Sequence, residues 1–204
     1  MGMRSNILVL GTGNQGKIRE LRELFGALPF ELKSLEDFGG ITDVEETGST
    51  FRDNAELKAC GFATQTHQLS LADDSGLEIE ALGDAPGVYS ARFAGEHSGY
   101  DVKIPKLLSM LDATGDVARR ARFVCVMALA DHDGRIVYSA EGICEGSIAA
   151  GPRGINGFGY DPIFVPDGFG STFGELPDDV KKQISHRARA AGRIIRYLLD
   201  FIAI

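Results

Sequence analysis

The sequence predicts an α/β fold, in which helices lie on the faces of a mixed β-sheet. Two observations predict it. Short apolar runs such as Ile7–Leu10 and residues 122–130 are typical of buried strands, whereas the apolar residues between positions 18 and 28 recur at helical spacing. Strand-like and helix-like segments follow each other without repeats or a low-complexity linker. The 204 residues suffice for a sizeable core, and we expect one domain over residues 1–204.

The N-terminal elements follow from apolar spacing and from breakers. Ile7–Leu10 is predicted to be a strand, and the helix after it stops at Pro29. Residues 30–35 are predicted to form a second strand, and residues 37–49 an acidic loop. Thr50 is then a candidate N-cap, because acidic side chains and an apolar face follow it.

Strands dominate the middle of the chain. A short strand is expected over residues 69–72, ending at the sequence Asp-Asp-Ser-Gly, and a half-buried one over 77–81. Residues 101–112 are predicted to be helical, although Pro105 limits where that helix begins. The strands 122–130 and 135–148 form a predicted hairpin. Residues 160–165 are a further expected strand, and one long helix is expected from residue 178 to the end.

Composition excludes several function classes. The net charge of −8 argues against broad electrostatic binding of nucleic acid. No apolar run approaches the roughly 20 residues of a membrane span, and the N-terminus lacks a signal-peptide pattern. The three cysteines are widely spaced and form no Cys-x-x-Cys pair, which argues against a disulfide framework or a zinc site. We expect a cytoplasmic protein without membrane or nucleic-acid partners.

The loop Gly11-Thr12-Gly13-Asn14-Gln15-Gly16-Lys17 matches two phosphate-loop patterns at once. Read as a dinucleotide fingerprint, it has a candidate ribose-binding acid in Glu36. Read as a triphosphate P-loop, it lacks the hydroxyl that holds magnesium, because Ile18 follows the lysine. A third interpretation is a tight structural turn. The loop still suits phosphate, since backbone amides and Lys17 would lie at a helix N-terminus.

Acidic residues supply a candidate metal site. Asp73 and Asp74 lie at a predicted strand end, where α/β sheets bind ligands, and successive residues of a strand point opposite ways. One of these two, with one of Glu45 and Glu46, would suit magnesium, which takes its other ligands from phosphate and water. The alternative is a solvated acidic turn.

A third cluster lies near the C-terminus. It combines Phe158-Gly159-Tyr160-Asp161-Pro162 with Lys181 and with Ser185-His186-Arg187. The aromatic residues are candidates for stacking on a purine, and the cationic residues for donating hydrogen bonds to a base or phosphate. The alternative is that the aromatic residues belong to the core.

These clusters together resemble the non-canonical purine nucleoside triphosphate pyrophosphatases, the inosine/xanthosine triphosphatase family. Matching blocks run in order from residue 7 to about residue 190, so the resemblance covers nearly the whole chain. The blocks are residues 12–17, Glu46-Thr47-Gly48, Asp73-Asp74-Ser75-Gly76-Leu77, Ala85-Pro86-Gly87, residues 158–162 and residues 185–187. One departure is Lys103, where relatives often carry asparagine.

The resemblance implies a fold and an activity. The fold is an elongated mixed sheet flanked by helices, with two lobes and a central cleft, and family members are typically homodimers. The activity is the magnesium-dependent hydrolysis of ITP, dITP and XTP to the monophosphate and pyrophosphate, which keeps these nucleotides out of DNA and RNA. Two alternatives stay open, a related pyrophosphatase of different base specificity and a nucleotide-binding module without turnover.

The resemblance also assigns roles to individual residues. Glu46 and Asp74 match the metal ligands, Asp74 the proposed general base, and Asp73 its partner. The triphosphate would be bound by the loop Thr12, Gly13, Asn14, Gln15, Gly16 and Lys17. Ser75 matches a substrate contact. The nucleobase pocket would consist of Phe158, Gly159, Tyr160, Asp161, Lys181, His186 and Arg187.

Overall fold

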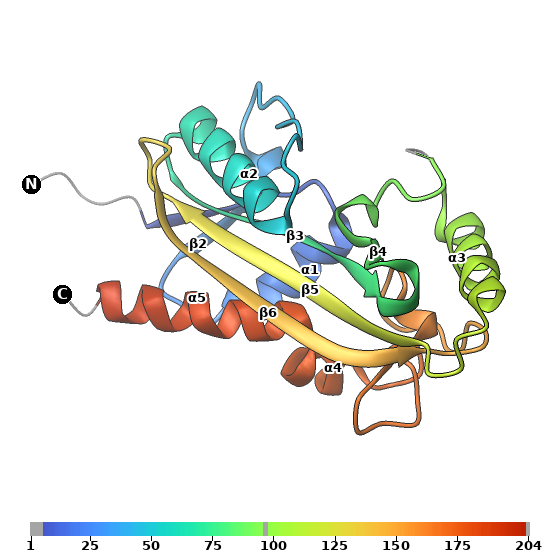
Figure 1. The fold of residues 1–204 in the computed structure, drawn as a ribbon. Coiled ribbons are helices and arrows are strands. Elements are labelled where there is room, and N and C mark those ends of the chain that lie inside the picture. Colours follow the sequence, from blue (N-terminus) through green and yellow to red (C-terminus); the bar gives the residue numbers. More distant parts are fainter. Residues whose placement is uncertain (1–5, 96–97, 203–204) are drawn as a thin grey trace, which may run out of the picture. The chain divides into compact units, whose positions relative to one another are not determined.

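The computed structural model describes residues 6–95 and 98–202. Within these residues the strands form one seven-stranded sheet in the order β2-β1-β3-β5-β6-β7, with β4 paired to β3 (Figure 1). β1 pairs in parallel with β2 and β3, whereas the pairs β3–β4 and β6–β7 are antiparallel. The predicted mixed sheet is therefore confirmed. The strands are β1 Ile7–Leu10, β2 Glu31–Ser34, β3 Leu69–Ile79, β4 Ala85–Pro86, β5 Arg120–Ala130, β6 Ile136–Ile148 and β7 Phe164–Pro166.

Five α-helices lie in the described part of the chain: α1 Gln15–Phe25, α2 Phe51–Thr66, α3 Tyr100–Thr114, α4 Asp178–Ile184 and α5 His186–Ile202. Among the described residues, none of the helices has both the length and the apolar character needed to cross a bilayer. The predicted helix at 101–112 begins before Pro105, as α3 starts at Tyr100.

The chain divides into two compact units. Unit one contains the residues up to Asp74, residues 125–142 and those from Arg187 onward, and unit two contains residues 75–124 and 143–186. The long strands β3, β5 and β6 each contribute residues to both units. The expectation of one domain over the whole chain stays a prediction.

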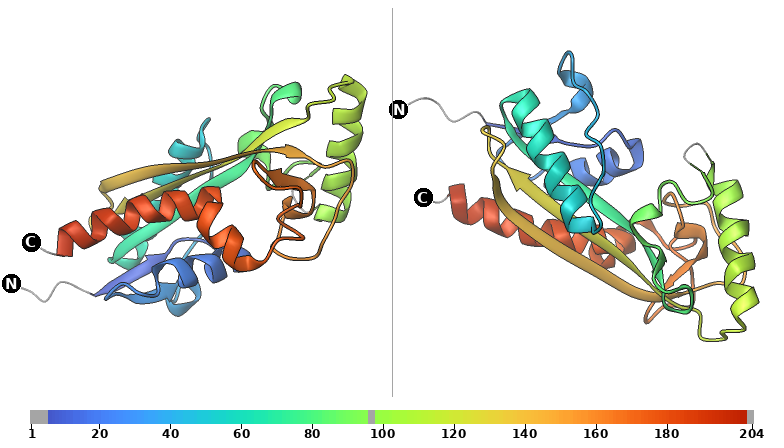
Figure 2. Two further views of the ribbon diagram at one scale, coloured as in Figure 1. Left: turned by 90° about the horizontal axis from the view of Figure 1, so that it is seen from below. Right: turned by 45° about the horizontal axis from the view of Figure 1, so that its top comes forward.

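Unit one places helices on both faces of its strands. The apolar side chains of α1 and α5 pack with Leu8, Leu10 and Leu71 in one core. α2 lies on the other face (Figures 1 and 2). There Phe62 approaches Gly11 so closely that a Cβ on Gly11 would be 2.8 Å from the Phe62 ring. Neighbouring residues of β3 therefore face different helices, because side chains alternate along a strand.

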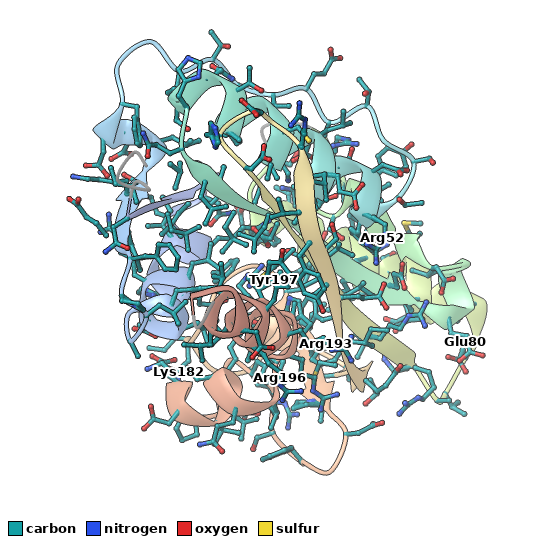
Figure 3. The ribbon with its side chains drawn as sticks, turned by 90° about the vertical axis from the view of Figure 1, so that its left-hand side faces the viewer. Arg52, Glu80, Lys182, Arg193, Arg196 and Tyr197 are labelled. Atoms are coloured by element: carbon teal, nitrogen blue, oxygen red, sulfur yellow. The ribbon has the colours of Figure 1, made fainter. Side chains whose placement is uncertain are left out.

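The C-terminal segment differs from the single long helix that the sequence predicts. α4 ends at Ile184, Ser185 is extended with φ −66° and ψ 156°, and α5 begins at His186. Serine favours such breaks because its hydroxyl competes for backbone hydrogen bonds. α5 then packs the ring of Tyr197 on that of Tyr138 at 4.5 Å, while Arg193 donates to the carbonyl of Glu141 (Figure 3).

Two further expectations about strands were wrong. The sequence Asp-Asp-Ser-Gly does not end a strand, since β3 runs unbroken from Leu69 to Ile79. The segment predicted as a strand at 160–165 begins with a 3₁₀ turn, Asp161–Ile163, and only Phe164–Pro166 form β7. Pro162 explains the turn, because it has no N–H group to donate to a neighbouring strand.

Thr50 caps α2, as predicted, and the cap gives a stability test. The Thr50 hydroxyl accepts the N–H of Asp53, and the Asp53 carboxylate accepts the N–H of Thr50, both at 3.1 Å. Thr50→Ala removes one of these bonds and should cost about 1 kcal/mol, which lowers Tm by about 3 °C in thermal denaturation. Thr50→Ser keeps the hydroxyl and is the control. An alanine variant with the wild-type Tm would contradict the cap's contribution.

Candidate functional site

The glycine-rich loop connects β1 to α1. The Thr12 hydroxyl accepts the N–H of Asn14 at 3.2 Å, and the Asn14 carboxamide oxygen accepts the N–H of Lys17 at 3.1 Å. Asn14 is thereby the N-cap of α1, so the loop presents a helix N-terminus, a place that attracts anions. Gly13, Asn14 and Gln15 are exposed.

Two residues that distinguish the two phosphate-loop patterns make local structural contacts. Ile18, which stands where a P-loop has its hydroxyl, is buried in the core with α1 and α5. Glu36, the candidate ribose-binding acid, accepts a hydrogen bond from the Gln15 side chain at 3.1 Å. Both side chains therefore have a local structural role.

Asp73 binds two cations at one oxygen. Its Oδ2 lies 3.1 Å from the Lys17 ammonium and 3.2 Å from the guanidinium of Arg187. Arg187 in turn contacts Glu20 of α1 at 2.6 Å. Asp73 and Arg187 are almost fully buried, at 1% and 2% exposure. Together with Lys17 and Glu20 they form a cluster of two negative and two positive charges around a buried ion pair.

Charge compensation fixes the protonation of this cluster. Burial alone would raise the pKa of Asp73, but the charges of Lys17, Arg187 and Lys58 outweigh it and hold that pKa well below its usual range. The pKa of Arg187 is raised in spite of burial, because Asp73 and Glu20 face it. Asp73 therefore stays ionised and acts as an anchor for its cations.

Asp74 belongs to a second group of charges, next to α2. Its Oδ1 lies 3.4 Å from the ammonium of Lys58, which also binds Glu46 at 2.6 Å. Its Oδ2 accepts a hydrogen bond from the Asn54 side chain at 3.1 Å. Burial raises the pKa of Asp74, and Glu46 adds to the shift, while Lys58 and Lys17 oppose it.

The two aspartates face opposite sides of one strand. Asp73 contacts side chains of α1 and α5, and Asp74 contacts side chains of α2 and Glu46. The sequence prediction that only one of them faces a given site therefore holds, although the reason is an unbroken strand and not a strand end.

The group around Asp74 fits a hard divalent cation. Carboxylate oxygens from Glu46 and Asp74 converge on one positive charge, the Lys58 ammonium. Among the described residues there is no group of three or more His, Cys, Asp or Glu side chains placed to hold a metal. Two carboxylates are nevertheless what magnesium takes from a protein when phosphate and water supply the rest.

Unit two contains a different cluster, formed by three residues of the predicted base pocket. Asp161 accepts hydrogen bonds from the N–H of Phe158 at 2.7 Å and from the Lys181 ammonium at 2.5 Å. The ammonium also lies 4.7 Å from the centre of the Phe158 ring. Gly157, with φ +71°, allows this arrangement, since a Cβ there would lie 2.0 Å from the Asp161 carboxylate. The cluster therefore holds an aromatic ring with a fixed positive charge over one of its faces.

The remaining predicted base-pocket residues divide between the two units. His186, which is 4% exposed, stacks on Phe123 at 4.7 Å in unit two. Tyr160 is buried there, and its hydroxyl donates to the carbonyl of Ser90 at 3.2 Å. Arg187 belongs to unit one and binds Asp73, so its contact with a base stays a prediction. Ser75 follows Asp74 on β3 as the first residue of unit two.

Sequence reasoning missed Lys58, Asn54 and Glu20. Lys58 and Asn54 are four residues apart on the buried face of α2, where they are 8% and 0% exposed. A signal for both was present, because they interrupt the apolar spacing of Phe51, Ala55, Ala59 and Phe62 at positions that face the sheet. Buried polar residues on such a face need partners, and nearby acids were the candidates.

Comparisons with known proteins identify the family of this chain and match its fold. The model of the Ham1 family matches residues 8–197. A dITP/XTP pyrophosphatase of Desulforamulus reducens is 49% identical over 191 residues, which cover 94% of each chain. That of Bacillus anthracis is 46% identical over 188 residues, or 92% of this chain and 93% of the relative. The structure of a HAM1 protein from Coxiella burnetii matches with TM-score 0.87 and 42% identity, covering 95% of this chain and 98% of that chain.

Proposed function

Because the chain belongs to the Ham1 family, we propose that it hydrolyses non-canonical purine nucleoside triphosphates such as ITP, dITP and XTP. The products would be the nucleoside monophosphate and pyrophosphate, and the role would be to keep these nucleotides out of DNA and RNA. The observation that carries the proposal is the convergence of Glu46 and Asp74 on one positive charge, in the same unit as the Lys17 loop.

The β1–α1 loop is proposed to bind the triphosphate. The N-terminus of α1 and the ammonium of Lys17 both offer positive charge, and Asp73 fixes the position of that ammonium. The backbone and side-chain donors of the loop would come from Thr12, Gly13, Asn14, Gln15 and Gly16. Because these groups would neutralise the outer phosphates, they favour the departure of pyrophosphate.

Glu46 and Asp74 are proposed to hold magnesium, which when bound would supply positive charge to the phosphate oxygens. Asn54 donates a hydrogen bond to one oxygen of Asp74, and the Lys58 ammonium lies near both carboxylates. Asp74 would then position the attacking water by accepting a hydrogen bond from it. Its raised pKa suits a group that interacts with a proton in the transition state.

The unit-two cluster is proposed to select the base. Lys181, held by Asp161, would donate to the oxygen at C6 of hypoxanthine or xanthine, and the ring of Phe158 would stack on the purine. Adenine has an amino group at C6, which cannot accept this hydrogen bond, so the pocket would favour purines with an oxygen at that position. Gly159, Tyr160, His186 and Ser75 would complete the pocket, with Arg187 as a further predicted contact.

The direct test is to incubate the protein with ITP and magnesium and to measure the released phosphate species. We expect pyrophosphate, a rate well above those with ATP and GTP, and loss of activity with EDTA that added magnesium restores. Release of orthophosphate alone, or equal rates with ATP and GTP, would contradict the proposal. Binding of ITP without turnover would support a binding module instead. We further propose that the protein is cytoplasmic and forms a homodimer. Size-exclusion chromatography with light scattering tests the homodimer, because it measures the molar mass in solution.

A further inference from the structure

The first residue of α3, Tyr100, contacts Tyr160 of the proposed base pocket. The ring of Tyr100 meets the ring of Tyr160 edge to face, with centroids 5.1 Å apart and an interplanar angle of 89°. This arrangement is a favourable one for an aromatic pair. Tyr160 is 3% exposed, so Tyr100 covers a residue that is itself part of the core.

Tyr100 also lies next to Gly159. A Cβ on Gly159 would lie 3.5 Å from the Tyr100 ring and hydroxyl, and the backbone of Gly159 is left-handed, with φ +70°. Gly159 stands between Phe158, the proposed stacking ring, and Tyr160. Tyr100 therefore lies beside the backbone that carries Phe158.

The electrostatics point to the same neighbourhood. Burial raises the pKa of Tyr100, and the negative charge of Asp161 raises it further. Asp161 is the carboxylate that holds both Lys181 and the Phe158 backbone. Tyr100 thus lies near the group on which the proposed selection of the base depends.

Lys103, three residues further along α3, places its ammonium over the ring of Tyr100. Its ammonium lies 4.8 Å from the centre of the Tyr100 ring and donates to the carbonyl of Ala91 at 2.5 Å. It is only 4% exposed, and burial lowers its pKa. A buried cation over an aromatic face is a strong form of this interaction, so Lys103 restricts the ring.

The hydroxyl end of Tyr160 is linked to the sheet through Ser90. The Tyr160 hydroxyl donates to the carbonyl of Ser90, and the Ser90 hydroxyl both accepts the N–H of Leu77 on β3 and donates to the carbonyl of Gly87. Tyr160 is therefore fixed at its hydroxyl by Ser90 and at its ring by Tyr100. The 158–161 segment is supported from both sides.

We propose that Tyr100, held by Lys103, is a positioning residue for base selection, which sets the place of the Phe158–Asp161 segment against the purine. The inference rests on the proposed function of that segment. Tyr100 acts through Gly159, Tyr160 and Asp161, and not by contact with the reacting phosphates. Its loss should therefore change substrate affinity and base selectivity more than turnover.

The test compares Tyr100→Ala and Tyr100→Leu with wild type, using ITP and ATP as substrates. We expect KM for ITP to rise about tenfold, less than the hundredfold that a misplacement of about 1 Å can cause, with kcat within twofold and a smaller preference for ITP over ATP. Tyr100→Phe should stay near wild type, because the ring alone fills the space. Lys103→Met should change KM in the same direction by a smaller factor.

Tyr89→Ala is the matched control, since Tyr89 is in the same unit but 60% exposed. The dissociation constant for inosine monophosphate, measured by calorimetry, gives a readout that does not need turnover, and the leucine variant keeps the test valid if the alanine variant fails to fold. Wild-type KM and selectivity in a folded Tyr100→Leu, or a fall in kcat with unchanged KM, would overturn the inference. Failure of the wild type to cleave ITP would overturn the proposed function instead, and the affinity for the monophosphate would still test Tyr100.

Discussion

Asp74→Asn is expected to lower kcat for ITP by about 10³-fold while leaving nucleotide binding largely intact. Asparagine keeps the size of the side chain and one acceptor oxygen but removes the charge. It therefore weakens the pairing with Lys58, the proposed holding of magnesium and the positioning of water at once. The measurement is pyrophosphate release at saturating ITP, together with the dissociation constant for inosine monophosphate.

The control for this variant is Asp167→Asn, which removes the same charge from an exposed pair with Arg120. Its kcat should match wild type, which shows that loss of one negative charge is not enough to affect turnover. If Asp74→Asn retains more than a tenth of wild-type kcat, Asp74 does not have the role proposed for it. Glu46→Gln should raise the magnesium concentration needed for half-maximal activity in the same assay, because it removes the second carboxylate.

Asp73→Asn is expected to lower stability by about 3–5 kcal/mol, a large fraction of the stability of an ordinary protein. The change removes the charge that faces both Lys17 and Arg187, and Arg187 is almost fully buried. A buried guanidinium without that partner is strongly unfavourable. Thermal denaturation should show a fall in Tm of about 10 °C. Asp167→Asn is again the control, and as an exposed pair it should change stability by less than about 1 kcal/mol.

The pH dependence of this difference follows from the direction of the shift. The pKa of Asp73 in the folded protein is far below its usual value, which is about 3.9 for an unfolded chain. The ionised Asp73 carboxylate therefore makes its full contribution to the free energy of unfolding above about pH 5. This contribution is lost progressively as the pH falls from about 5 toward the pKa that Asp73 has in the folded protein. The gap in Tm between wild type and Asp73→Asn should be constant from pH 5 to pH 8 and shrink in acid. A gap that grows below pH 4 would contradict the assignment.

The fold could be predicted from the sequence where apolar spacing decides local structure. The β1 strand, the helix after it and the cap at Thr50 follow from residues that are close in sequence. The course of β3 could not, because Asp-Asp-Ser-Gly is typical of a turn when its neighbours are unknown. Its two acids remain in a strand because Lys17, Arg187 and Lys58, all distant in sequence, supply the opposite charge.

The candidate site was predicted to a similar extent. Lys17 was a candidate from the loop pattern, and the family resemblance selected Glu46 and Asp74 among the candidate acids. Unit one brings each of them into a charged cluster. The resemblance did not indicate that Lys58 joins Glu46 to Asp74. Contacts of this kind depend on which helix face meets which strand, and that is determined by packing over the whole unit.

The alternation along β3 also has a consequence for how the gene can change in evolution. Because Asp73 and Asp74 face different helices, one residue inserted or deleted before them would turn each acid to the opposite face of the strand, away from its present partners. The loop between Asp37 and Thr50 is not a strand, so a change in its length away from Glu46 would not turn a whole row of side chains to another face. Insertions and deletions among descendants of this sequence should therefore accumulate in loops and be purged from this strand, whereas single substitutions are tolerated or rejected according to charge.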